Sequence, residues 1–413
     1  MLGSGAREHA LFWKLMQSEL VEVVYAAPGS GSTQAIRAAV AIDPKDPKAV
    51  LDVVKERNID LTVIGPDDVV AAGVADALTI AGKQVFGPTA AAGRVESSKA
   101  FAKELMQAAG VPTAPARIFD DARQAQDYAR AHGSGLVVKA DGLALGKGVT
   151  VCETVEHTVA AIDRAMLQGV YGEAGRRVVL EERINGKEAS IMCFCDGKRV
   201  LAMEPARDYK RAGDGDTGPN TGGMGAYSPP SDVGAEVRNR VVRECAQPAV
   251  DELARRGTPY LGCLYVQVML TADGPRVIEY NSRFGDPETQ VVLPRLKGDL
   301  AYVMRACAAG DLDGVELDWD GGATVGVVVA SGGYPGSYDA GKRIEGLLAL
   351  EQGVVAFHAG TRFTGEGFVT SGGRVLTVVA SGPTVEAARE NAYRNVEKVR
   401  FDGAFFRRDI AAA

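Results

Sequence analysis

The chain has 413 residues, 46% hydrophobic and 24% charged, values close to those of ordinary globular proteins. Lys and Arg number 46 against 53 Asp and Glu, so the formal charge is −7 and indicates no basic surface for nucleic acid. No signal peptide or membrane-length apolar run is present, and the six Cys show no framework spacing. We therefore expect a cytoplasmic protein of several domains, with reduced thiols and no membrane or nucleic-acid partner.

Residues 1–96 alternate helix-like and strand-like segments. An amphipathic helix is predicted where Leu11/Leu15 and Phe12/Met16 recur at i,i+4. Short apolar runs closed by Gly and Pro predict the strands Val21–Tyr25, Leu61–Ile64 and Gln84–Phe86. This alternation favours a Rossmann-like parallel sheet covered on both faces, with ligands beyond the carboxyl ends of its strands.

The opening loop, Gly3-Ser4-Gly5, resembles a dinucleotide-binding turn but lacks the rest of that fingerprint. Glu8 stands where the third glycine belongs, and no acid ends the next predicted strand. An anion held by backbone N–H groups at the helix start, with Arg7 as charged partner, needs only part of the motif. A tight structural turn is the alternative. Because only Met1 and Leu2 precede the loop, we expect that the first part of a buried strand lies upstream of this sequence.

A helix over Ser98–Ala109 leads into a compact α+β unit, residues 113–190. Its loop VVKADGLALGKGVTV is not a P-loop, because three residues rather than four separate Gly142 from Gly146, and a glycine follows Lys147. Lys139 lies between apolar residues, where lysine is seldom buried without a partner. The loop therefore predicts a glycine flap that covers a triphosphate; a generic glycine hairpin is the alternative.

Two carboxylates, Glu181 and Glu188, flank a strand-to-loop crossing in VLEERINGKEAS. They are placed to accept hydrogen bonds from an adenine amino group and from ribose hydroxyls, with the backbone around Ile184 beside the ring. A solvated acidic rim is the alternative interpretation.

The hairpin VMLTADGPRVIEYN carries a candidate metal site. Glu279 and Asn281 are two apart in a strand and so share one face. A three-residue loop at Asp273-Gly274 puts Gln267 on that face, whereas a two-residue loop turns it away. Oxygen ligands on one face, completed by phosphate oxygens and water, suit Mg²⁺.

Two features follow the hairpin. Arg283 has a forked guanidinium suited to a carboxylate or acyl phosphate. Asp286-Pro287 is equally compatible with a helix N-cap followed by its first helical residue and with a substrate contact.

A long polar loop, Asp208–Tyr227, precedes the hairpin, and a β-rich module begins near residue 318. We predict domains over residues 1–96, 97–317 (with 113–190 as a flexible lid) and 318–413.

Seven stretches in order resemble the ATP-grasp ligases, and among them the glycinamide ribonucleotide synthetases (phosphoribosylamine–glycine ligases): GSGAREHA, FGPTAAAGRVESSKAFAKELM, VVKADGLALGKGV, VLEERINGKEAS, DGDTGPNTGGMGAYSP, VIEYNSRFGDPETQ and GGYPGSY. The resemblance spans nearly the whole chain. It implies an α/β and α+β multidomain protein: an ATP-grasp fold with a Rossmann-like N-terminal domain, as in biotin carboxylase, and a small β-rich C-terminal domain. A weaker relation to biotin carboxylase and purine-pathway carboxylases covers only the ATP-grasp core.

The resemblance implies ligation of glycine to 5-phosphoribosylamine with ATP and Mg²⁺ (or Mn²⁺), through glycyl phosphate. It makes Lys139, Arg283 and Lys99 the catalytic residues, and it makes Glu279 and Asn281 the metal ligands, with Gln267 as the third. It assigns ATP to Lys99, Lys139, Gly146, Lys147, Gly148, Glu181, Ile184 and Glu188. It assigns the substrates to Gly3, Gly5, Arg7, Glu8, Asp67, Asp214, Asn220, Thr221, Gly222, Arg283 and Asp286.

The sequence departs from this family at two places. Asp67 stands where the family usually has Glu, and the family has a longer strand before the first glycine loop. The alternatives are an ATP-dependent carboxylase of the biotin carboxylase or aminoimidazole ribonucleotide type, and a nucleotide-sensing module without turnover. The carboxylase predicts bicarbonate-dependent ADP release, whereas a sensor needs no acyl-phosphate pocket. The substrates are small molecules, and we expect a monomer or weak homo-oligomer.

Overall fold

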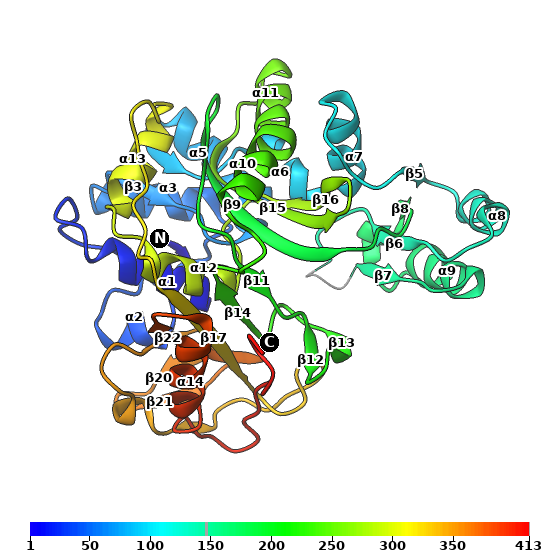
Figure 1. Cartoon of the computed structure of the whole chain (residues 1–413). Helices are drawn as coiled ribbons and strands as arrows, with labels where there is room; N and C mark the ends of the chain where they lie inside the picture. The colour runs from blue at the N-terminus through cyan, green and yellow to red at the C-terminus, as the bar shows by residue number, and fades with distance from the viewer. Residues whose placement is uncertain (145–147, 413) are drawn as a thin grey trace.

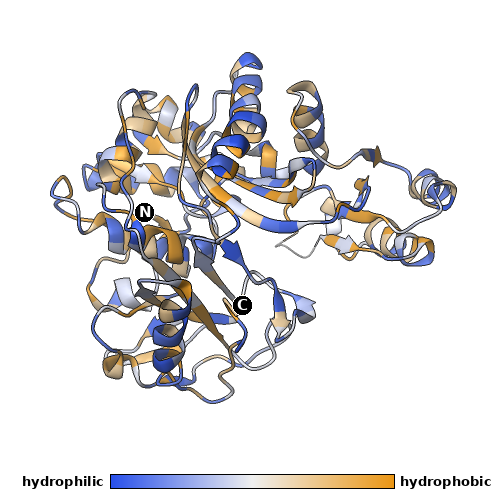
Figure 2. Ribbon diagram, in the orientation of Figure 1, coloured by the Kyte–Doolittle hydropathy of each residue, from blue (hydrophilic) through white to orange (hydrophobic). Residues whose placement is uncertain are grey.

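The computed structural model describes residues 1–144 and 148–412, so Gly146 and Lys147 of the predicted flap lie outside the described residues. Figure 1 shows the N-terminal part in blue above the C-terminal part in orange and red. The unit around residues 116–181 projects to one side of them. In Figure 2 the strands carry much of the apolar colour, as expected for sheets that form cores.

The N-terminal part is built on short parallel strands. β1 (Leu2–Gly3) pairs with β2 (Ala27–Pro28), β3 (Leu61–Val63) pairs with β4 (Gln84–Phe86), and a parallel bridge from Leu2 to Ile64 joins the pairs. The helices are α1 (Ala6–Leu15), α2 (Gly31–Ala35), α3 (Pro47–Glu56), α4 (Asp67–Ala71), α5 (Val74–Ile80) and α6 (Ala90–Ser97). The predicted parallel sheet is confirmed.

The predicted strand Val21–Tyr25 is wrong. Pairing with β1 begins at Ala27, whose N–H donates to the carbonyl of Met1 (2.9 Å). Tyr25 instead accepts a hydrogen bond from the amino group of Met1 (2.8 Å). The strand forms only where β1 offers a partner, a limit that apolar composition alone does not reveal.

The central sheet is antiparallel, with the order β10–β9–β15–β16. Its strands are β9 (Lys187–Asp196), β10 (Val200–Ala202), β15 (Leu261–Thr271) and β16 (Gly274–Asn281). The helices α7 (Lys99–Ala108), α10 (Ala235–Val241) and α11 (Gln247–Arg255) pack on it around one core, which includes Leu105, Leu253 and Val266. This sheet supplies the predicted metal-binding hairpin.

The hairpin β15–β16 has a two-residue loop, because Thr271 pairs with Gly274. The register then shifts between Gln267 and Val268, which pair with Glu279 and Val277, so Ile278 is an extra residue. Such a bulge reverses the alternation of side chains. The rule that a two-residue loop turns Gln267 away from Glu279 is therefore wrong here, because the bulge places the two residues opposite each other.

The projecting unit is a four-stranded sheet with the order β5–β8–β6–β7. Its elements are β5 (Ala116–Phe119), β6 (Val137–Ala140), β7 (Val149–Val151), β8 (Val178–Glu181), α8 (Ala122–His132) and α9 (Val155–Ile162). Both helices are N-capped, by the side chains of Asp121 and Thr154. After Ile162, α9 continues to Leu167 as a π-helical turn. The unit has its own small core, which includes Leu136 and Leu180.

The C-terminal sheet has the order β11–β14–β17–β22–β19. Its strands are β11 (Arg207–Asp208), β14 (Gly225–Ser228), β17 (Ala323–Ala330), β19 (Val355–His358) and β22 (Arg374–Gly382), and α14 (Val385–Val396) packs on it. A smaller sheet joins β18 (Arg343–Ile344), β21 (Phe368–Thr370) and β20 (Thr361–Phe363).

The polar segment Asp208–Tyr227 is not a plain loop. It contains β11, β14 and the hairpin of β12 (Arg211–Gly213) and β13 (Thr217–Asn220). β14 pairs with β17, so this segment extends the sheet of the C-terminal part. Its polar, glycine-rich composition hid β14, whose pairing partner β17 lies about a hundred residues further along the chain.

The N-terminal part, the central sheet with its helices and the C-terminal part share a hydrophobic core, which contains Phe12, Phe194, Phe284 and Phe357. The helices α12 (Glu288–Val292) and α13 (Leu300–Ala309) contribute to the same core. No described helix has the length and hydropathy required to cross a membrane.

Candidate active site

Lys139, Glu181 and Lys103 form a buried cluster where the projecting unit meets α7. The Glu181 carboxylate lies 3.0 Å from the Lys139 Nζ through Oε2, and 3.2 Å from the Lys103 Nζ through Oε1. Lys139 also donates to the carbonyl of Ile278 (2.8 Å), the bulged residue of β16. We call these three side chains the lysine cluster. Two cations and one carboxylate leave it with a net charge of +1, which attracts an anion.

Lys103 was missed by the sequence reasoning. Its Nζ donates to the Thr113 hydroxyl (2.7 Å) and to the Ala114 carbonyl (3.2 Å). Burial lowers the pKa of Lys103 to about 8, although the Glu181 carboxylate opposes this shift. A signal was present in the sequence, because Lys99 and Lys103 are four apart and so share a helix face.

The predicted metal ligands lie together on the hairpin. The Nδ2 of Asn281 donates to the Oε1 of Glu279 (3.4 Å), and Gln267 pairs with Glu279 across the strands. Burial alone would raise the pKa of Glu279, but the ammonium groups of Lys99, Lys210 and Lys139 outweigh it and lower this pKa to about 2. Glu279 is therefore ionised at neutral pH, and these oxygens suit a hard divalent cation.

Lys99 and Lys210 approach the hairpin from different elements. The Lys99 Nζ lies 3.9 Å from the Oε2 of Glu279 and donates to the Glu96 carbonyl (3.2 Å). The Lys210 Nζ lies 3.1 Å from the Oε2 of Glu188, and the same oxygen accepts from the Nε2 of Gln267 (2.7 Å). Lys210 was not among the predicted residues, although it lies within the polar segment Asp208–Tyr227, which supplies four of the predicted substrate residues.

Asp208 lies near Lys210, Glu188 and Glu288. Burial, together with the negative charges of Glu288 and Glu188, raises the pKa of Asp208 to about 7 against the opposing charge of Lys210.

Ile184 is half-buried in the link between β8 and β9, between the two predicted nucleotide carboxylates, Glu181 and Glu188. Gly148 accepts a hydrogen bond from the N–H of Ala140 through its carbonyl (2.8 Å).

Arg283 is held by a carboxylate that the sequence reasoning did not identify. Its Nε lies 3.1 Å from the Oε1 of Glu96, and its Nη2 donates to the Oδ1 of Asn281 (3.1 Å). Glu96 also accepts from the N–H (2.7 Å) and the hydroxyl (2.9 Å) of Ser282. Burial, together with the charge of Asp67, raises the pKa of Glu96 against the opposing charge of Arg283. Asp67 thus lies near Arg283 at the start of α4.

The hydrogen-bond donors of the opening loop are bound by Glu8, a residue in the first turn of α1. The Oε2 of Glu8 accepts from the N–H of Gly5 (2.7 Å), and its Oε1 accepts from the Nε of Arg7 (2.6 Å). A Cβ on Gly3, where φ is +118°, would lie 2.6 Å from the Cγ of Glu8. The hollow beside the loop leaves no volume that a water molecule could occupy, so it is not a preformed ligand pocket.

The predicted substrate residues on the segment 208–227 do not all gather. Asp214 accepts from the N–H of Arg408 (2.7 Å), and Asn220 is exposed on the hairpin β12–β13. The Thr221 hydroxyl donates to the carbonyl of Lys210 (2.8 Å), and the N–H of Gly222 donates to the Tyr334 hydroxyl (3.0 Å). Thr221 is thus linked through Lys210 and Glu188 to Gln267 of the metal-binding hairpin, whereas Asp214 contacts the C-terminal segment.

Asp286 is not a helix N-cap, since α12 begins at Glu288 and Pro287 is its cap residue. Its Oδ1 accepts from the Nε2 of Gln290 (2.7 Å), and its Oδ2 lies 2.9 Å from the Nη2 of Arg374. The N-cap interpretation of Asp286-Pro287 is therefore wrong, while a substrate contact stays a prediction.

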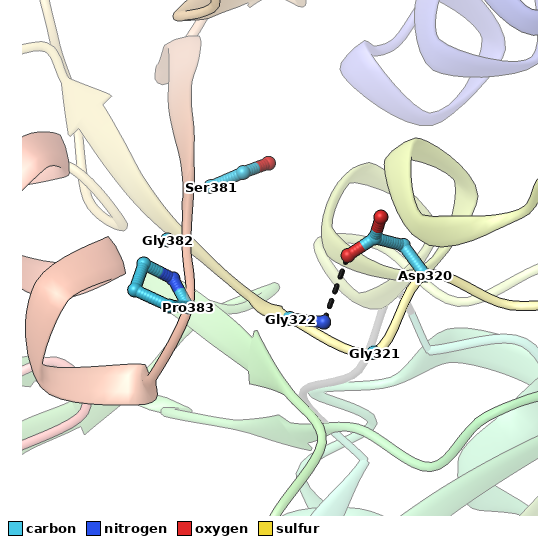
Figure 3. Close-up of a pocket in the computed structure, with 6 residues that line it drawn as sticks. All are labelled: Asp320, Gly321, Gly322, Ser381, Gly382 and Pro383. Atoms are coloured by element: carbon cyan, nitrogen blue, oxygen red, sulfur yellow. Dashed lines mark hydrogen bonds between the residues drawn. The ribbon is translucent and has the colours of Figure 1, made fainter.

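A surface hollow of about 560 Å³ lies away from all these residues (Figure 3). It is lined by Asp320, Gly321, Gly322, Ser381, Gly382 and Pro383. The Oδ1 of Asp320 accepts from the N–H of Gly322 (2.8 Å), and no lining residue is cationic. This hollow therefore does not suit a nucleotide triphosphate, and volume alone does not locate the site.

Comparison with known proteins matches three family models to the chain: the N domain (residues 1–96), the ATP-grasp (A) domain (97–289) and the C domain (324–413) of phosphoribosylglycinamide synthetase. Phosphoribosylamine–glycine ligase of Agrobacterium fabrum is 46% identical over 99% of this chain and 97% of its own. The enzyme of the same name from Halalkalibacterium halodurans is 46% identical over 100% of this chain and 96% of its own.

Solved structures are similar over nearly the whole chain. Phosphoribosylamine–glycine ligase from Thermotoga maritima superposes with a TM-score of 0.85 at 32% identity, covering 99% of this chain and 98% of its own. The biotin carboxylase domain of the Hydrogenobacter thermophilus 2-oxoglutarate carboxylase, in complex with MgADP and bicarbonate, gives 0.74 at 18% identity, covering 98% and 91%. The latter likeness concerns the fold alone.

Proposed function

Because this chain belongs to the phosphoribosylglycinamide synthetase family and is an ATP-grasp ligase of purine biosynthesis, we propose that the residues around the lysine cluster join glycine to 5-phosphoribosylamine. The products are glycinamide ribonucleotide, ADP and phosphate. The observation that carries this assignment is the buried net charge of +1 on Lys103, Lys139 and Glu181, beside the ionised Glu279. A triphosphate with a divalent cation complements both charges. The carboxylase alternative is not favoured, because the full-length relatives at 46% identity are ligases.

In the first step a carboxylate oxygen of glycine attacks the γ-phosphorus of ATP, and ADP leaves. Charge on the transferred phosphoryl group is met by Lys139, Lys99 and Arg283. Arg283 is already fixed by Glu96 and Asn281, so little reorganisation is needed when the group arrives.

In the second step the uncharged amine of phosphoribosylamine attacks the acyl carbon of glycyl phosphate, and phosphate leaves. An amine is already a nucleophile, so no Ser or Cys nucleophile is required. The acyl phosphate hydrolyses readily, and residues 113–190 together with the segment 208–227 would exclude water from it.

Glu279 and Asn281, with Gln267 as third, would hold Mg²⁺ or Mn²⁺. Their donor set fits, because an ionised carboxylate and two amide side chains share one part of the hairpin. The bound ion would neutralise phosphate charge and orient the triphosphate. We expect Glu279→Gln to shift the Mg²⁺ titration of activity to higher concentration; an unchanged titration would remove Glu279 from the ligands.

The remaining predicted contacts complete the proposal. ATP would contact Gly146, Lys147, Gly148, Glu181, Ile184 and Glu188. Phosphoribosylamine would contact Gly3, Gly5, Arg7, Glu8 and Asp67, and glycine would contact Thr221, Gly222 and Asp286. For Asp214 and Asn220, which do not gather with these residues, a substrate contact stays a prediction. The boundaries 1–96, 97–317 and 318–413, a cytoplasmic location and a monomer or weak homo-oligomer stay predictions.

ADP release tests the function when glycine and phosphoribosylamine are supplied singly and together. Sustained release is expected only with both, together with formation of the amide product. Bicarbonate-dependent release would favour a carboxylase, and release without the amine would contradict the ligase assignment.

A further inference from the structure

Arg374, the first residue of β22, connects the C-terminal part to two predicted substrate loops. Its Nη1 donates to the carbonyls of Gly222 (2.6 Å), Asp286 (3.3 Å) and Gly223 (3.4 Å). Its Nη2 lies 2.9 Å from the carboxylate of Asp286. One guanidinium thus contacts both loops, although they are more than 60 residues apart in the sequence.

The loop at residues 221–223 is difficult to fix by backbone preference alone. Gly222 and Gly223 have no side chains to anchor them, and Gly223 has φ +111°. Their N–H groups donate to single hydroxyls, those of Tyr334 (3.0 Å) and Thr221 (2.9 Å). Arg374 adds contacts to both carbonyls and is the ion-pair partner of Asp286 among the described residues. The guanidinium therefore sets the distance between the two loops.

The charges around Asp286 are consistent with a held carboxylate. Burial alone would raise the pKa of Asp286, but the positive charges of Arg374 and Arg7 outweigh it and lower the pKa. A Cβ on Gly223 would lie 2.4 Å from the Cδ of Pro287, so the two loops pack directly on each other. A shift in one loop therefore displaces the other.

We propose that Arg374 is a positioning residue supplied by the C-terminal domain. It holds the loop at residues 221–223 and the loop that contains Asp286, the predicted contacts of glycine and glycyl phosphate, at a fixed distance from each other. This inference rests on the proposed function and adds a role for the C-terminal domain. Arg374 acts through Gly222, Gly223 and Asp286 rather than on the reacting atoms.

The test compares Arg374→Gln and Arg374→Lys with the native chain. A matched control is Arg343→Gln, since Arg343 lies in the same domain, is mostly exposed and has only a 4.0 Å pairing with Glu345. We expect Arg374→Gln to lower kcat/KM for glycine about 10- to 100-fold. We also expect it to leave the KM for ATP within about twofold and to increase ADP release per amide formed. Arg374→Lys should recover part of the loss, because it keeps the charge but not the fork.

Hydrogen exchange gives a second readout that does not depend on activity. The amides of Gly222 and Gly223 should exchange faster in Arg374→Gln, with the melting transition still cooperative. Unchanged exchange and unchanged glycine kinetics would overturn the inference, as would equal increases in KM for glycine and ATP. If the native chain forms no amide, the proposed function fails and the role in catalysis fails with it, while exchange still reports whether Arg374 holds the loops.

Discussion

The opening loop and Lys139 of the lysine cluster were both predicted to bind phosphate, yet the charges around them are balanced differently. In the loop, Glu8 engages both the N–H of Gly5 and the guanidinium of Arg7, so one cation meets one anion. In the cluster, Glu181 is shared between Lys103 and Lys139, so one anion meets two cations. Only the cluster has a charge left for a ligand to neutralise.

The comparison shows that a glycine loop at a helix start is an anion site only when its donors are available. For phosphoribosylamine phosphate to bind at Gly5 and Arg7, the Glu8 carboxylate must release at least one of them. In the lysine cluster, Lys139 needs no such exchange, because its ammonium group donates to Glu181 and Ile278 and keeps a third N–H. An incoming triphosphate adds the missing negative charge.

The largest effect is expected from Glu181→Gln, which leaves two buried ammonium groups without their shared counter-charge. Removal of one partner of a buried ion pair costs about 3–5 kcal/mol of folding free energy. Urea denaturation should show this loss, and the loss should shrink as pH rises and Lys103, whose pKa burial lowers to about 8, gives up its proton. Glu188→Gln is the control, since Glu188 is 44% exposed and pairs with an accessible lysine. Equal stability of the two variants would contradict the charge balance described for the cluster.

Lys139→Ala should instead leave a neutral Lys103–Glu181 pair and a folded protein. We expect a loss of about 100- to 1,000-fold in kcat, because a donor to the transferred phosphoryl group is removed. Steady-state kinetics and thermal unfolding measure the two effects separately. Lys187→Ala is the control, because Lys187 is 74% exposed on β9, a strand of the central sheet. Near-normal turnover of Lys139→Ala would remove Lys139 from the site.

Sequence reasoning found the groups whose neighbours are close in the chain. Lys139 stood out because an ionic side chain lay in an apolar strand, and Glu279 and Asn281 because alternate strand residues share a face. It missed Glu96 and Arg374, whose partners Ser282 and Asp286 lie 186 and 88 residues away. No local sequence pattern predicts such contacts, because they depend on how the N-terminal part, the central sheet and the C-terminal part pack together.

The fold was predicted better than its local details. The family resemblance and the strand–helix alternation gave the ATP-grasp architecture and the N-terminal parallel sheet. The bulge at Ile278 was not predicted, and it decides on which face Gln267 lies. A single inserted residue reverses side-chain alternation without changing the apolar pattern that identifies the strand.

Gly3→Ala tests whether the opening loop is built around Glu8. The new Cβ adds strain at φ +118° and meets the Cγ of Glu8 at 2.6 Å. We expect a loss of about 1–3 kcal/mol in the free energy of unfolding. Gly82→Ala is the control, because Gly82 has φ +69° and nothing within 4 Å of the added atom, so only the backbone strain is shared. If both variants lose the same stability, the Glu8 contact contributes nothing measurable.

The smallest effect concerns His9, which follows Glu8 and ties α1 to the C-terminal part. Its Nδ1 accepts from the N–H of His358 (2.8 Å), and its Nε2 lies 2.9 Å from the Ser32 hydroxyl. Burial, aided by His358, lowers the pKa of His9 to about 3. The folded state therefore binds fewer protons than the unfolded state below about pH 6.5, and its stability falls as pH decreases.

Between pH 7 and 5.5 this histidine should remove about 1 kcal/mol of stability from the native chain. His9→Asn lacks the titrating ring, so urea unfolding should show a smaller loss over the same interval. His157→Asn is the control, because His157 is exposed and should leave the pH dependence unchanged. If His9→Asn and the native chain lose the same stability, the ring is protonated without cost. In that case burial beside the opening loop would impose no cost on a positive charge, and the contrast between the two regions would rest on Glu8 alone.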